Sequence, residues 1–499
     1  MEEQISEEIV EKTEENKPVK GKALKAGVAY TICTFLLKGM AFLTMPIFTR
    51  IMVKSDIGLF STMSSWISIL SVVVTLSLYN SVPIAKYDYK KDFKAYISSI
   101  AIFSLIPAVV FGIIVFALGG FVSDAIGLPK YSIYIALIYL VFCSSLEILQ
   151  CQLRVEYKYK SFVIITLASA LITLAASLIL VNTMSDGFMG RAIGGYVPLI
   201  IISFVAMIFL IVRGRSFKWK HIKYALVISL PLVIHGLAST IMHSSDRIMI
   251  QALCDSDSVA LYSVAYSGAL LVNMLRNSME SAWDPWVFDM LSEDNRQRIR
   301  SFSYPYILFF VAASIGIIFL APEFLWLMGG KGYVEAMYVV PPVVLAYVCS
   351  MFYSLYGGLE RYYKKQIVFP IFGSICAATN IGLNFLFIPI YGYIAAAYTT
   401  LICCFMEMLF HFLFCKKLKV DNTYNTKFNI LILLICGGFT ALGIFLYNYS
   451  IIRYSVVGAL VLIVIVFVIV KRQWIKDYIK TIRTKKPPVE RKDNDEVAR

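Results

Sequence analysis

A series of long apolar runs constrains this 499-residue chain more than any other feature of its sequence. The runs are about 18–25 residues long, the length that a helix needs to span the hydrocarbon core of a bilayer. Soluble barrels or doubly wound folds interrupt apolar segments far more often. The chain is also 59% hydrophobic and only 16% charged, with a mean hydropathy of +0.73. We therefore predict an all-α polytopic membrane protein.

The apolar runs predict about fourteen transmembrane helices. Their expected limits are 24–48, 57–84, 95–118, 131–151, 161–182, 188–212, 224–250, 259–280, 303–321, 333–358, 366–388, 391–414, 428–448 and 451–470. The longest expected connection, 281–300, is too short for a soluble catalytic domain.

Lysine and arginine placement predicts the topology. Basic residues gather in alternate connections, as at 213–223 and 416–419, and the polar segment 1–23 has no apolar stretch. Because basic loops stay on the cytoplasmic side, we expect both termini there, in the bacterial cytoplasmic membrane. The formal charge of +14 then reflects topology, and we expect no nucleic-acid partner. The ten cysteines lack the spacing of metal ligands, and we expect no metal and no cofactor.

A short repeat predicts two similar halves. Arg50-Ile51-Met52 followed by Gly58-Leu59-Phe60-Ser61 matches Arg247-Ile248-Met249 followed by Ala260-Leu261-Tyr262-Ser263. Each copy follows the first helix of a six-helix unit, so the units share one orientation in the membrane. We expect an N-lobe at 24–212, a C-lobe at 213–415, two further helices at 416–470 and a basic cytoplasmic tail at 471–499.

Polar residues inside the expected spans indicate a functional interior, because charges are costly in a bilayer. Lys38 lies well inside the first span, where it either faces a cavity or snorkels to the interface. The span 259–280 carries a polar stripe at helical spacing, formed by Tyr262, Tyr266, Asn273, Arg276, Asn277 and Glu280. Arg276 offers a fork for phosphate oxygens, or it pairs with Glu280 within the helix.

The span 224–250 carries a second stripe, formed by His235, Ser239, His243 and Asp246. The histidines either make hydrogen bonds between helices or help to carry protons. Pro231 precedes His235 by one turn and could bend the helix. Glu147 and Glu407 are further buried carboxylates on separate spans, and His411 follows Glu407 by one turn.

Several motifs resemble those of Wzx-type polysaccharide flippases in the multidrug/oligosaccharidyl-lipid/polysaccharide exporter (MOP) superfamily. The motifs are Pro46 with Phe48-Thr49-Arg50 and Gly58, and then Leu230-Pro231, Asp246-Arg247-Ile248, Ala260-Leu261-Tyr262 and Ala282-Trp283-Asp284-Pro285-Trp286. Ala260 stands where the family often has glycine. The hydropathy pattern of the chain also resembles that of the family over nearly the whole chain after residue 21.

The resemblance implies two six-helix bundles around a central cavity that opens alternately to either side. It also implies an undecaprenyl-diphosphate-linked oligosaccharide as cargo, membrane lipids as surroundings, and a polysaccharide polymerase and a chain-length regulator as partners. We expect Lys38 and Arg276 to bind the diphosphate from opposite lobes. We expect Tyr262 and Tyr266 to stack on sugar rings, and Asn273 and Asn277 to belong to the substrate-binding site. We expect Arg50 and Arg247 to anchor helix ends through Asp56 and Asp246.

An ion gradient is the expected driving force, since the sequence has no ATPase signature. His235, His243, Asp246 and Glu407 are the candidates for ion coupling. Three alternatives remain open: a drug/cation antiporter of the same superfamily, a lipid II flippase and a membrane polysaccharide polymerase. Two basic residues in the expected pocket favour an anionic cargo, and short external connections argue against a polymerase.

Overall fold

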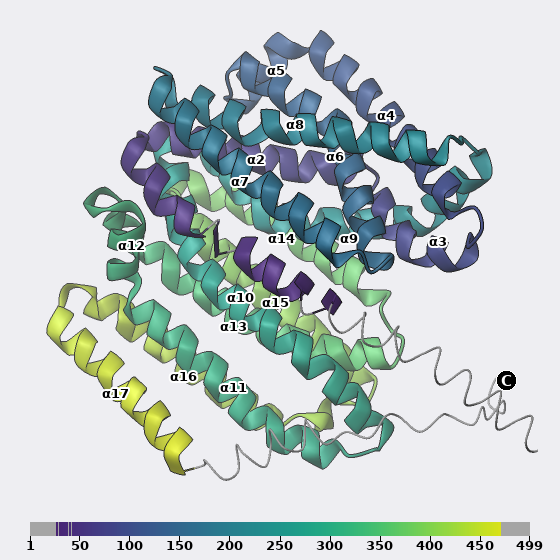
Figure 1. Ribbon diagram of the computed structural model, residues 1–499. Coiled ribbons are helices and arrows are strands. Elements are labelled where there is room, and N and C mark those ends of the chain that lie inside the picture. Colours follow the sequence, from purple (N-terminus) through teal and green to yellow (C-terminus); the bar gives the residue numbers. More distant parts are fainter. Residues whose placement is uncertain (1–25, 28, 38, 41, 471–499) are drawn as a thin grey trace, which may run out of the picture.

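A computed structural model describes residues 26–470 of the chain, apart from 28, 38 and 41. Helices make up 90% of the structure, and the described part contains no strand (Figure 1). Thirteen helices of that part are long and apolar enough to cross a membrane, and α17 (Ser450–Val470) is a fourteenth long helix. The predicted all-α membrane fold with about fourteen spans is confirmed. The predicted tails, 1–23 and 471–499, lie outside the described residues.

The first half of the chain forms one group of packed helices. Its long members are the first helix (Ala29–Ile51), α2 (Lys54–Val74), α4 (Phe93–Ala117), α6 (Lys130–Val155), α7 (Tyr159–Thr183) and α8 (Gly187–Gly214). The helix α8 packs against α4, α6 and α7 and is the centre of this group. Two short helices, α3 (Val82–Asp88) and α5 (Gly119–Ile126), lie between the long ones.

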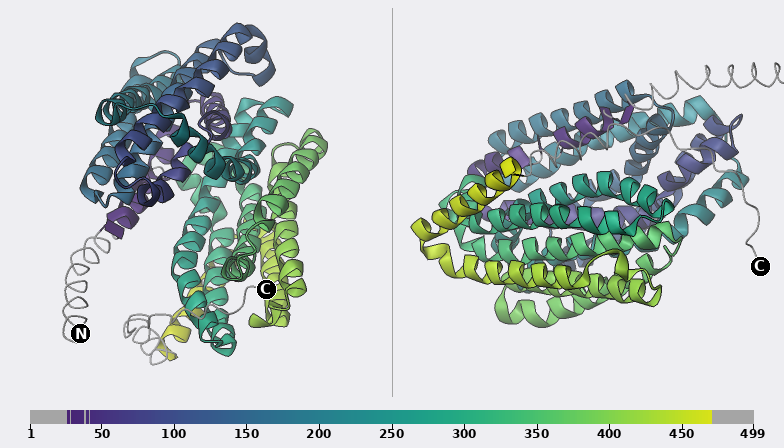
Figure 2. Two further views of the ribbon diagram at one scale, coloured as in Figure 1. Left: turned by 90° about the vertical axis from the view of Figure 1, so that its right-hand side faces the viewer. Right: turned by 90° about the horizontal axis from the view of Figure 1, so that it is seen from below.

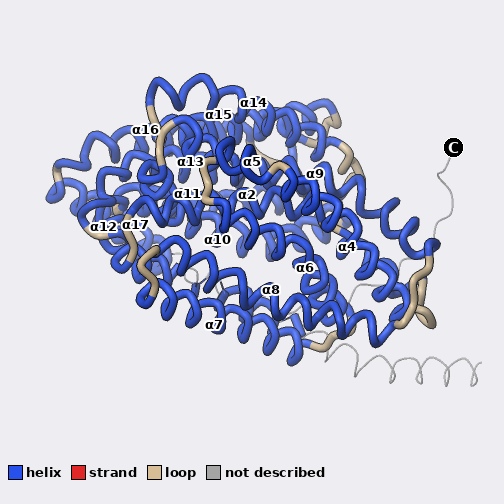
Figure 3. Tube along the Cα trace, turned by 90° about the horizontal axis from the view of Figure 1, so that it is seen from above, coloured by secondary structure: helices blue, strands red, loops and turns tan. Residues whose placement is uncertain are grey.

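The second half forms another group, coloured teal to yellow in Figure 1. Its long members are α9 (Trp219–Leu253), α10 (Ser256–Ser292), α11 (Arg296–Phe319), α13 (Val340–Tyr362), α14 (Val368–Tyr391), α15 (Ile394–Lys417) and α16 (Thr426–Phe445), with α17 at the edge. The helix α13 packs against α10, α15 and α16, and α14 packs against α9 and α15. The tube view shows α14 to α16 on one side of the molecule and α6 to α8 on the other (Figure 3).

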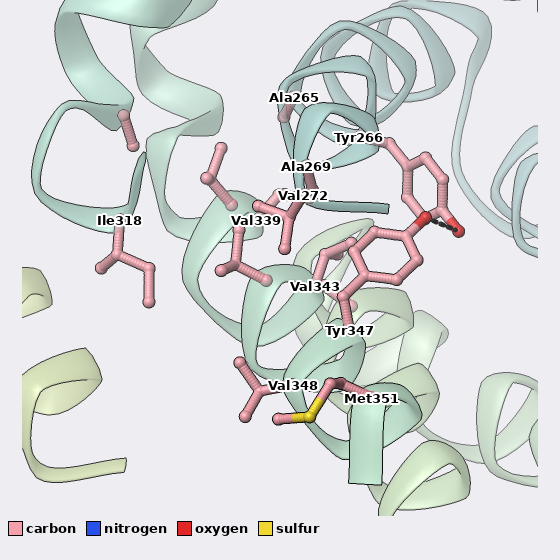
Figure 4. Packing of buried hydrophobic residues seen from close by; sticks show 14 of the residues in the cluster. Ala265, Tyr266, Ala269, Val272, Ile318, Val339, Val343, Tyr347, Val348 and Met351 are labelled. Atoms are coloured by element: carbon pink, nitrogen blue, oxygen red, sulfur yellow. Dashed lines mark hydrogen bonds between the residues drawn. The ribbon is translucent and has the colours of Figure 1, made fainter. Parts of the chain in front are cut away.

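Small side chains allow close packing inside the second half. Ala265, Ala269 and Val272 of α10 face Val343 and neighbouring apolar residues of α13 (Figure 4). In the sequence of both helices, apolar residues recur at helical spacing, so these residues lie on one stripe of each helix. The core of the protein is therefore centred on α10 and α13.

The two halves meet where α2 packs against α9 and α10. A Cβ atom on Gly58 of α2 would lie 1.8 Å from the backbone oxygen of Ser256, at the start of α10. Only glycine permits this approach. Ala260, at the matching position of the second repeat copy, is fully buried. Figure 2 shows the two groups side by side, with the contact between them along part of their length.

Two predicted boundaries are wrong, whereas the predicted span 333–358 lies within one helical span, Lys331–Tyr362, made of the 3₁₀ helix η2 (Lys331–Val339) and α13. The span 57–84 ends earlier, because α2 stops at Val74, Leu76 and Ser77 turn the chain with positive φ, and η1 (Leu78–Ser81) follows. The connection 281–300 is mostly helical, since α10 continues through Pro285 to Ser292.

Candidate functional site

The second half contains a polar cavity of about 270 Å³, here called the C-half cavity. The polar residues that line it come from four helices, α9, α10, α13 and α15. Its polar lining consists of His235, Ser239, His243, Asn273, Arg276, Glu280, Tyr347, Ser350, Tyr353 and Glu407. Parts of the two polar stripes of α9 and α10, together with the Glu407 carboxylate of α15, therefore face a common space. Pro231 lies one turn before His235, and α9 runs through it as a continuous helix.

Two charged residues of the C-half cavity, Arg276 and Glu280, are neutralised by their neighbours. The Arg276 guanidinium donates to Glu280 at 2.8 Å, to Asn277 at 2.7 Å and to Asn273 at 3.0 Å, all on its own helix. Arg361 of α13 donates to Glu280 at 3.2 Å and also contacts Asp284. The intrahelical Arg276–Glu280 pair, one of the two expected arrangements, is the one that the structure contains.

The tyrosines of the α10 stripe lie in the core instead of the cavity. Tyr262 is fully buried and donates to Asp246 at 2.5 Å. Tyr266 contacts His243 at 3.3 Å and accepts from Tyr347 at 3.1 Å. The predicted sugar contacts of Tyr262 and Tyr266 do not fit this arrangement, since both rings are buried and the Arg247 guanidinium lies 5.9 and 4.8 Å from their centroids.

Asp246 is satisfied by uncharged donors. Besides Tyr262, Asn384 of α14 donates to it at 2.8 Å and Thr400 of α15 at 3.0 Å. The expected Arg247–Asp246 pair is not formed. Asp246 instead ties α9, α10, α14 and α15 together, because it is fully buried and needs several donors.

A larger cavity of about 600 Å³ lies between the two halves and is here called the central cavity. The first helix, α2, α7 and α8 line it from one half, and α9 and α10 line it from the other. Its polar lining consists of Thr44, Ser61, Ser64, Ser65, Ser68, Thr173, Ser177, Arg191, Tyr196, Ser244, Arg247, Ser263 and Ser267. Among the described residues, no aspartate or glutamate lines this cavity.

Two arginines from opposite halves enter the central cavity. Arg191 of α8 stacks on Phe48 at 3.6 Å and on Phe60 at 4.7 Å from ring centroids. Arg247 of α9 donates to Ser263 at 3.2 Å and to the backbone oxygen of His243 at 3.0 Å. In the part of the chain that the structure describes, neither guanidinium pairs with a carboxylate. Aromatic faces and neutral oxygens contact both groups, and no carboxylate forms an ion pair with either of them among the described residues.

Contacts between the halves also form next to Phe48 and Met52, two residues that line the central cavity. Thr49 donates to the backbone oxygen of Met328 at 2.6 Å, and Arg50 donates to that of Leu327 at 3.0 Å, both at the end of α12 (Ala321–Gly329). Lys54 pairs with Glu335 at 2.9 Å. The expected Arg50–Asp56 pair is not formed, because Arg50 reaches across to the other half. Arg50 is therefore a link between halves.

The opposite end of α9 carries another buried histidine. His221, 2% exposed, contacts Ser99 at 3.1 Å, and its Nε2 lies 3.7 Å from Asp92. A hydrogen bond from the Lys218 ammonium holds the pKa of Asp92 below its ordinary value. These contacts fix the start of α9 to α4.

The sequence matches a known family over more than half of its length. The model of the polysaccharide biosynthesis protein family matches residues 23–291. The chain belongs to this family. The family prediction made from its motifs is confirmed, and the protein is a multi-pass membrane transporter of the flippase type. No curated protein is significantly similar to it in sequence.

Solved structures show that this member of the polysaccharide biosynthesis protein family has the fold of the MOP superfamily. The lipid II flippase MurJ in an inward closed conformation is 18% identical, with a TM-score of 0.65 over 90% of this chain and 100% of that chain. An inward-facing multidrug resistance transporter of the MATE family is 14% identical, with a TM-score of 0.60 over 80% of this chain and 98% of that chain.

Sequence reasoning missed Arg191 and the serines of α2. Arg191 lies near the start of an apolar run, where it resembles a residue of the membrane interface. Ser61, Ser64, Ser65 and Ser68 have helical spacing that could have marked a polar face. Lys38, the other expected cation of the binding site, lies outside the described residues, and its role stays a prediction.

Proposed function

We propose that this protein flips undecaprenyl-diphosphate-linked oligosaccharide repeat units from the cytoplasmic to the outer leaflet by alternating access. The proposal places it in the bacterial cytoplasmic membrane with both termini cytoplasmic. An ion gradient drives the cycle, and a polysaccharide polymerase with its chain-length regulator uses the product. The protein performs no chemistry on its cargo.

The observation that carries the proposal is that two arginines enter the central cavity, whose described lining contains no carboxylate. Arg191 and Arg247 come from different halves and have no carboxylate partner among the described residues. Charges inside a membrane protein are costly unless a partner offsets them, so this arrangement favours an anionic ligand. Guanidinium groups bind phosphate oxygens through two parallel hydrogen bonds, and the surrounding hydroxyls donate further ones.

Cavity size supports a head group as the ligand. The volume of about 600 Å³ falls within the range of roughly 300–1,000 Å³ that small-molecule sites occupy. This volume can hold a diphosphate with its nearest sugars, but it is too small to hold a long polyprenyl tail in addition. In this proposal the tail stays in the bilayer while the head group crosses between the halves.

A two-sided anion site also suggests how binding promotes transport. A diphosphate held by Arg191 and Arg247 links the two halves, and it stabilises whichever conformation brings the arginines together. A ligand shifts a conformational equilibrium only by its difference in affinity for the two states. Arginines on both halves supply such a difference.

The rival functions make different demands on the cavity. A drug/cation antiporter requires carboxylates for its cargo, and the described lining of the central cavity has none. A lipid II flippase carries the same diphosphate with another sugar, so it differs only in head-group selectivity. Short connections between the described helices argue against a polymerase.

Purified protein in proteoliposomes tests the proposal. Labelled undecaprenyl-diphosphate oligosaccharide should move between leaflets with the parent and should fail to move with Arg191→Ala or Arg247→Ala. Arg213→Ala is the matched control, since Arg213 lies on α8 like Arg191, contacts a phenylalanine ring and is exposed. Unchanged flipping in both cavity variants would contradict the proposal, as would movement of cationic drugs in place of the lipid.

A further inference from the structure

Four hydroxyl groups of the central cavity donate their hydrogen to the backbone of their own helix. Ser65 and Ser68 of α2 donate to the carbonyl oxygens one turn earlier, at 2.9 and 2.8 Å. Thr173 of α7 donates to the preceding turn at 2.9 Å, and Ser267 of α10 does so at 2.6 Å. These four lining residues are here called the acceptor wall. A hydroxyl has one hydrogen and two lone pairs, so each of them presents acceptors to a ligand.

Two other hydroxyls of the cavity are bonded in the opposite way. Ser263 accepts from Arg247 at 3.2 Å, and Ser64 accepts from a tyrosine hydroxyl at 3.0 Å. Because each of them accepts, its own hydrogen remains for a ligand. Along α10, Ser267 of the acceptor wall follows Ser263 by one turn, and on α2 the acceptor serines likewise follow Ser64. The cavity therefore has a donor zone beside Arg247 and an acceptor zone farther along the same helices.

Ser177 of α7 is a buried hydroxyl at the same cavity that lacks a partner. Its side chain is fully buried, and its oxygen makes no hydrogen bond among the described residues. It lines the cavity one turn after Thr173. Buried hydroxyls are normally satisfied, since an unmade hydrogen bond is destabilising. A polar ligand in the cavity supplies the partner that the described protein atoms do not.

The charges of the described lining balance a diphosphate and no further anion. Arg191 and Arg247 are the only cations of that lining, and it contains no aspartate or glutamate. A diphosphate diester has one negative charge on each phosphate, so two guanidinium groups balance it. A carboxylate on the sugar would add a third negative charge without a third cation in the described lining. Unpaired charges are costly inside a membrane protein.

We propose that the acceptor wall binds the sugars of the cargo and selects uncharged sugars over sugars that carry a carboxylate. The proposal rests on the proposed flippase function and names the class of sugar that it carries. Uncharged sugars present hydroxyl or acetamido N–H donors, and these bind Ser65 or Ser68 without breaking a bond of the protein. A carboxylate only accepts, so a serine must first give up its backbone hydrogen bond to donate to it.

A positively charged amino sugar would also offer donors to the acceptor wall. Arg191 and Arg247 enter the same cavity of about 600 Å³, however, and like charges in one site disfavour binding strongly. The cavity therefore favours a cargo whose charge is confined to its diphosphate.

The test compares two synthetic cargoes that differ at one carbon. One is a short-chain isoprenyl diphosphate that carries glucose, and the other carries glucuronic acid, in which a carboxylate replaces the C6 hydroxymethyl group. Calorimetry with the full-length protein measures both, together with the same isoprenyl diphosphate without a sugar. We expect the glucosyl compound to bind about tenfold to a hundredfold more tightly than the glucuronosyl compound, because the carboxylate loses its hydration without gaining a cation.

A lysine in the acceptor wall should reverse this preference. Ser68 is an exposed side chain of the cavity, so Ser68→Lys adds a cation there with room for the longer side chain. The glucuronosyl compound should then bind more tightly than the glucosyl compound. Ser278→Lys is the matched control, since Ser278 of α10 is exposed, makes the same bond to the preceding turn at 2.8 Å and does not line the cavity. It should keep the parent preference.

A second variant removes acceptors without adding charge. Ser65→Ala/Ser68→Ala should weaken binding of the glucosyl compound by about tenfold, since two neutral hydrogen bonds are lost. Binding of the sugar-free diphosphate should stay at the parent level. This variant and the parent comparison decide the question even if the lysine variant does not fold.

The remaining outcomes contradict either the inference or the proposed function. A parent that binds the glucuronosyl compound as tightly as the glucosyl compound overturns the inference, and loss of that binding in Lys38→Ala would identify a third cation. A folded Ser68→Lys that keeps the parent preference overturns the role of the wall, as does an equal loss of sugar-free diphosphate in the double alanine variant. A parent that binds none of the three diphosphates refutes the proposed function itself.

Discussion

The two polar cavities of this protein differ in whether their arginines are paired with a carboxylate. In the C-half cavity, Arg276 is bound by Glu280 and two asparagines, so its charge is satisfied within one half. In the central cavity, Arg191 and Arg247 rest on aromatic rings and neutral oxygens without a carboxylate among the described residues. Satisfied charges stabilise a structure, whereas uncompensated ones favour a ligand of opposite sign. From this comparison we propose that the central cavity binds the cargo and that the C-half cavity links helices of one half.

Removal of the central arginines should give the largest effect on cargo affinity. Charge-assisted hydrogen bonds contribute about 1.5–3 kcal/mol each, so Arg191→Ala or Arg247→Ala should weaken head-group affinity by about tenfold to 150-fold. Titration calorimetry with a short-chain isoprenyl diphosphate measures this. Lysine at either position should recover part of the affinity through its charge. Equal losses in Arg213→Ala would remove the distinction between cavity and surface.

Gly58→Ala should destabilise the contact between the halves. The added Cβ would lie 1.8 Å from the Ser256 backbone oxygen, and overpacking of this kind costs about 1–3 kcal/mol. Thermal unfolding should show the loss, and cysteine cross-linking between α2 and α10 should become less efficient. Gly437→Ala on α16 is the control, since nothing lies within 4 Å of its added Cβ. An unchanged cross-linking yield would show that the halves do not need this close approach.

Glu280→Gln should lower stability and leave head-group affinity unchanged. Glu280 is bound by Arg276 and Arg361, whose side chains are 17% and 29% exposed, so solvent screening limits the loss to about 1 kcal/mol. Glu335→Gln, at a more exposed pair with Lys54, serves as the comparison and should cost less. A strong fall in head-group affinity in Glu280→Gln would place the C-half cavity in the cargo site after all.

Loss of a single hydroxyl from the central cavity should have the smallest effect. One neutral hydrogen bond contributes about 0.5–1.5 kcal/mol, so Ser61→Ala should reduce affinity by at most about tenfold. Ser278→Ala, at an exposed serine of α10, should have no effect. Competition binding with the isoprenyl diphosphate distinguishes the two. A loss in Ser61→Ala as large as that in Arg191→Ala would mean that charge is not the main determinant.

The sequence predicted the helices well because hydropathy is a local property. It also placed His235, His243, Arg276 and Glu407 on polar faces, since helical spacing determines which residues share a face. It could not predict that these faces meet in one cavity, because the meeting depends on how α9, α10 and α15 pack. For the same reason Tyr262 was assigned to the binding surface, although α10 turns it toward Asp246.

Arg191 is a residue of the central cavity that the sequence did not reveal. Its position near the start of an apolar run is typical of an interface residue, and only the approach of α9 and the first helix makes it part of a cavity. The break after Val74 was missed because Leu76 and Leu78 continue the apolar run, while Leu76 and Ser77 turn the backbone with positive φ. Local sequence thus determined the helices, and tertiary packing determined the site.

The sign of the charge that the central cavity binds is the most direct test of this account. Calorimetry should compare a short-chain isoprenyl diphosphate with a cationic amphiphile of the same tail, using the parent and the Arg191→Ala/Arg247→Ala double variant. We expect the parent to bind the diphosphate in preference to the cation, and the double variant to lose that preference. A parent that prefers the cation, or a double variant that still prefers the diphosphate, would contradict the account.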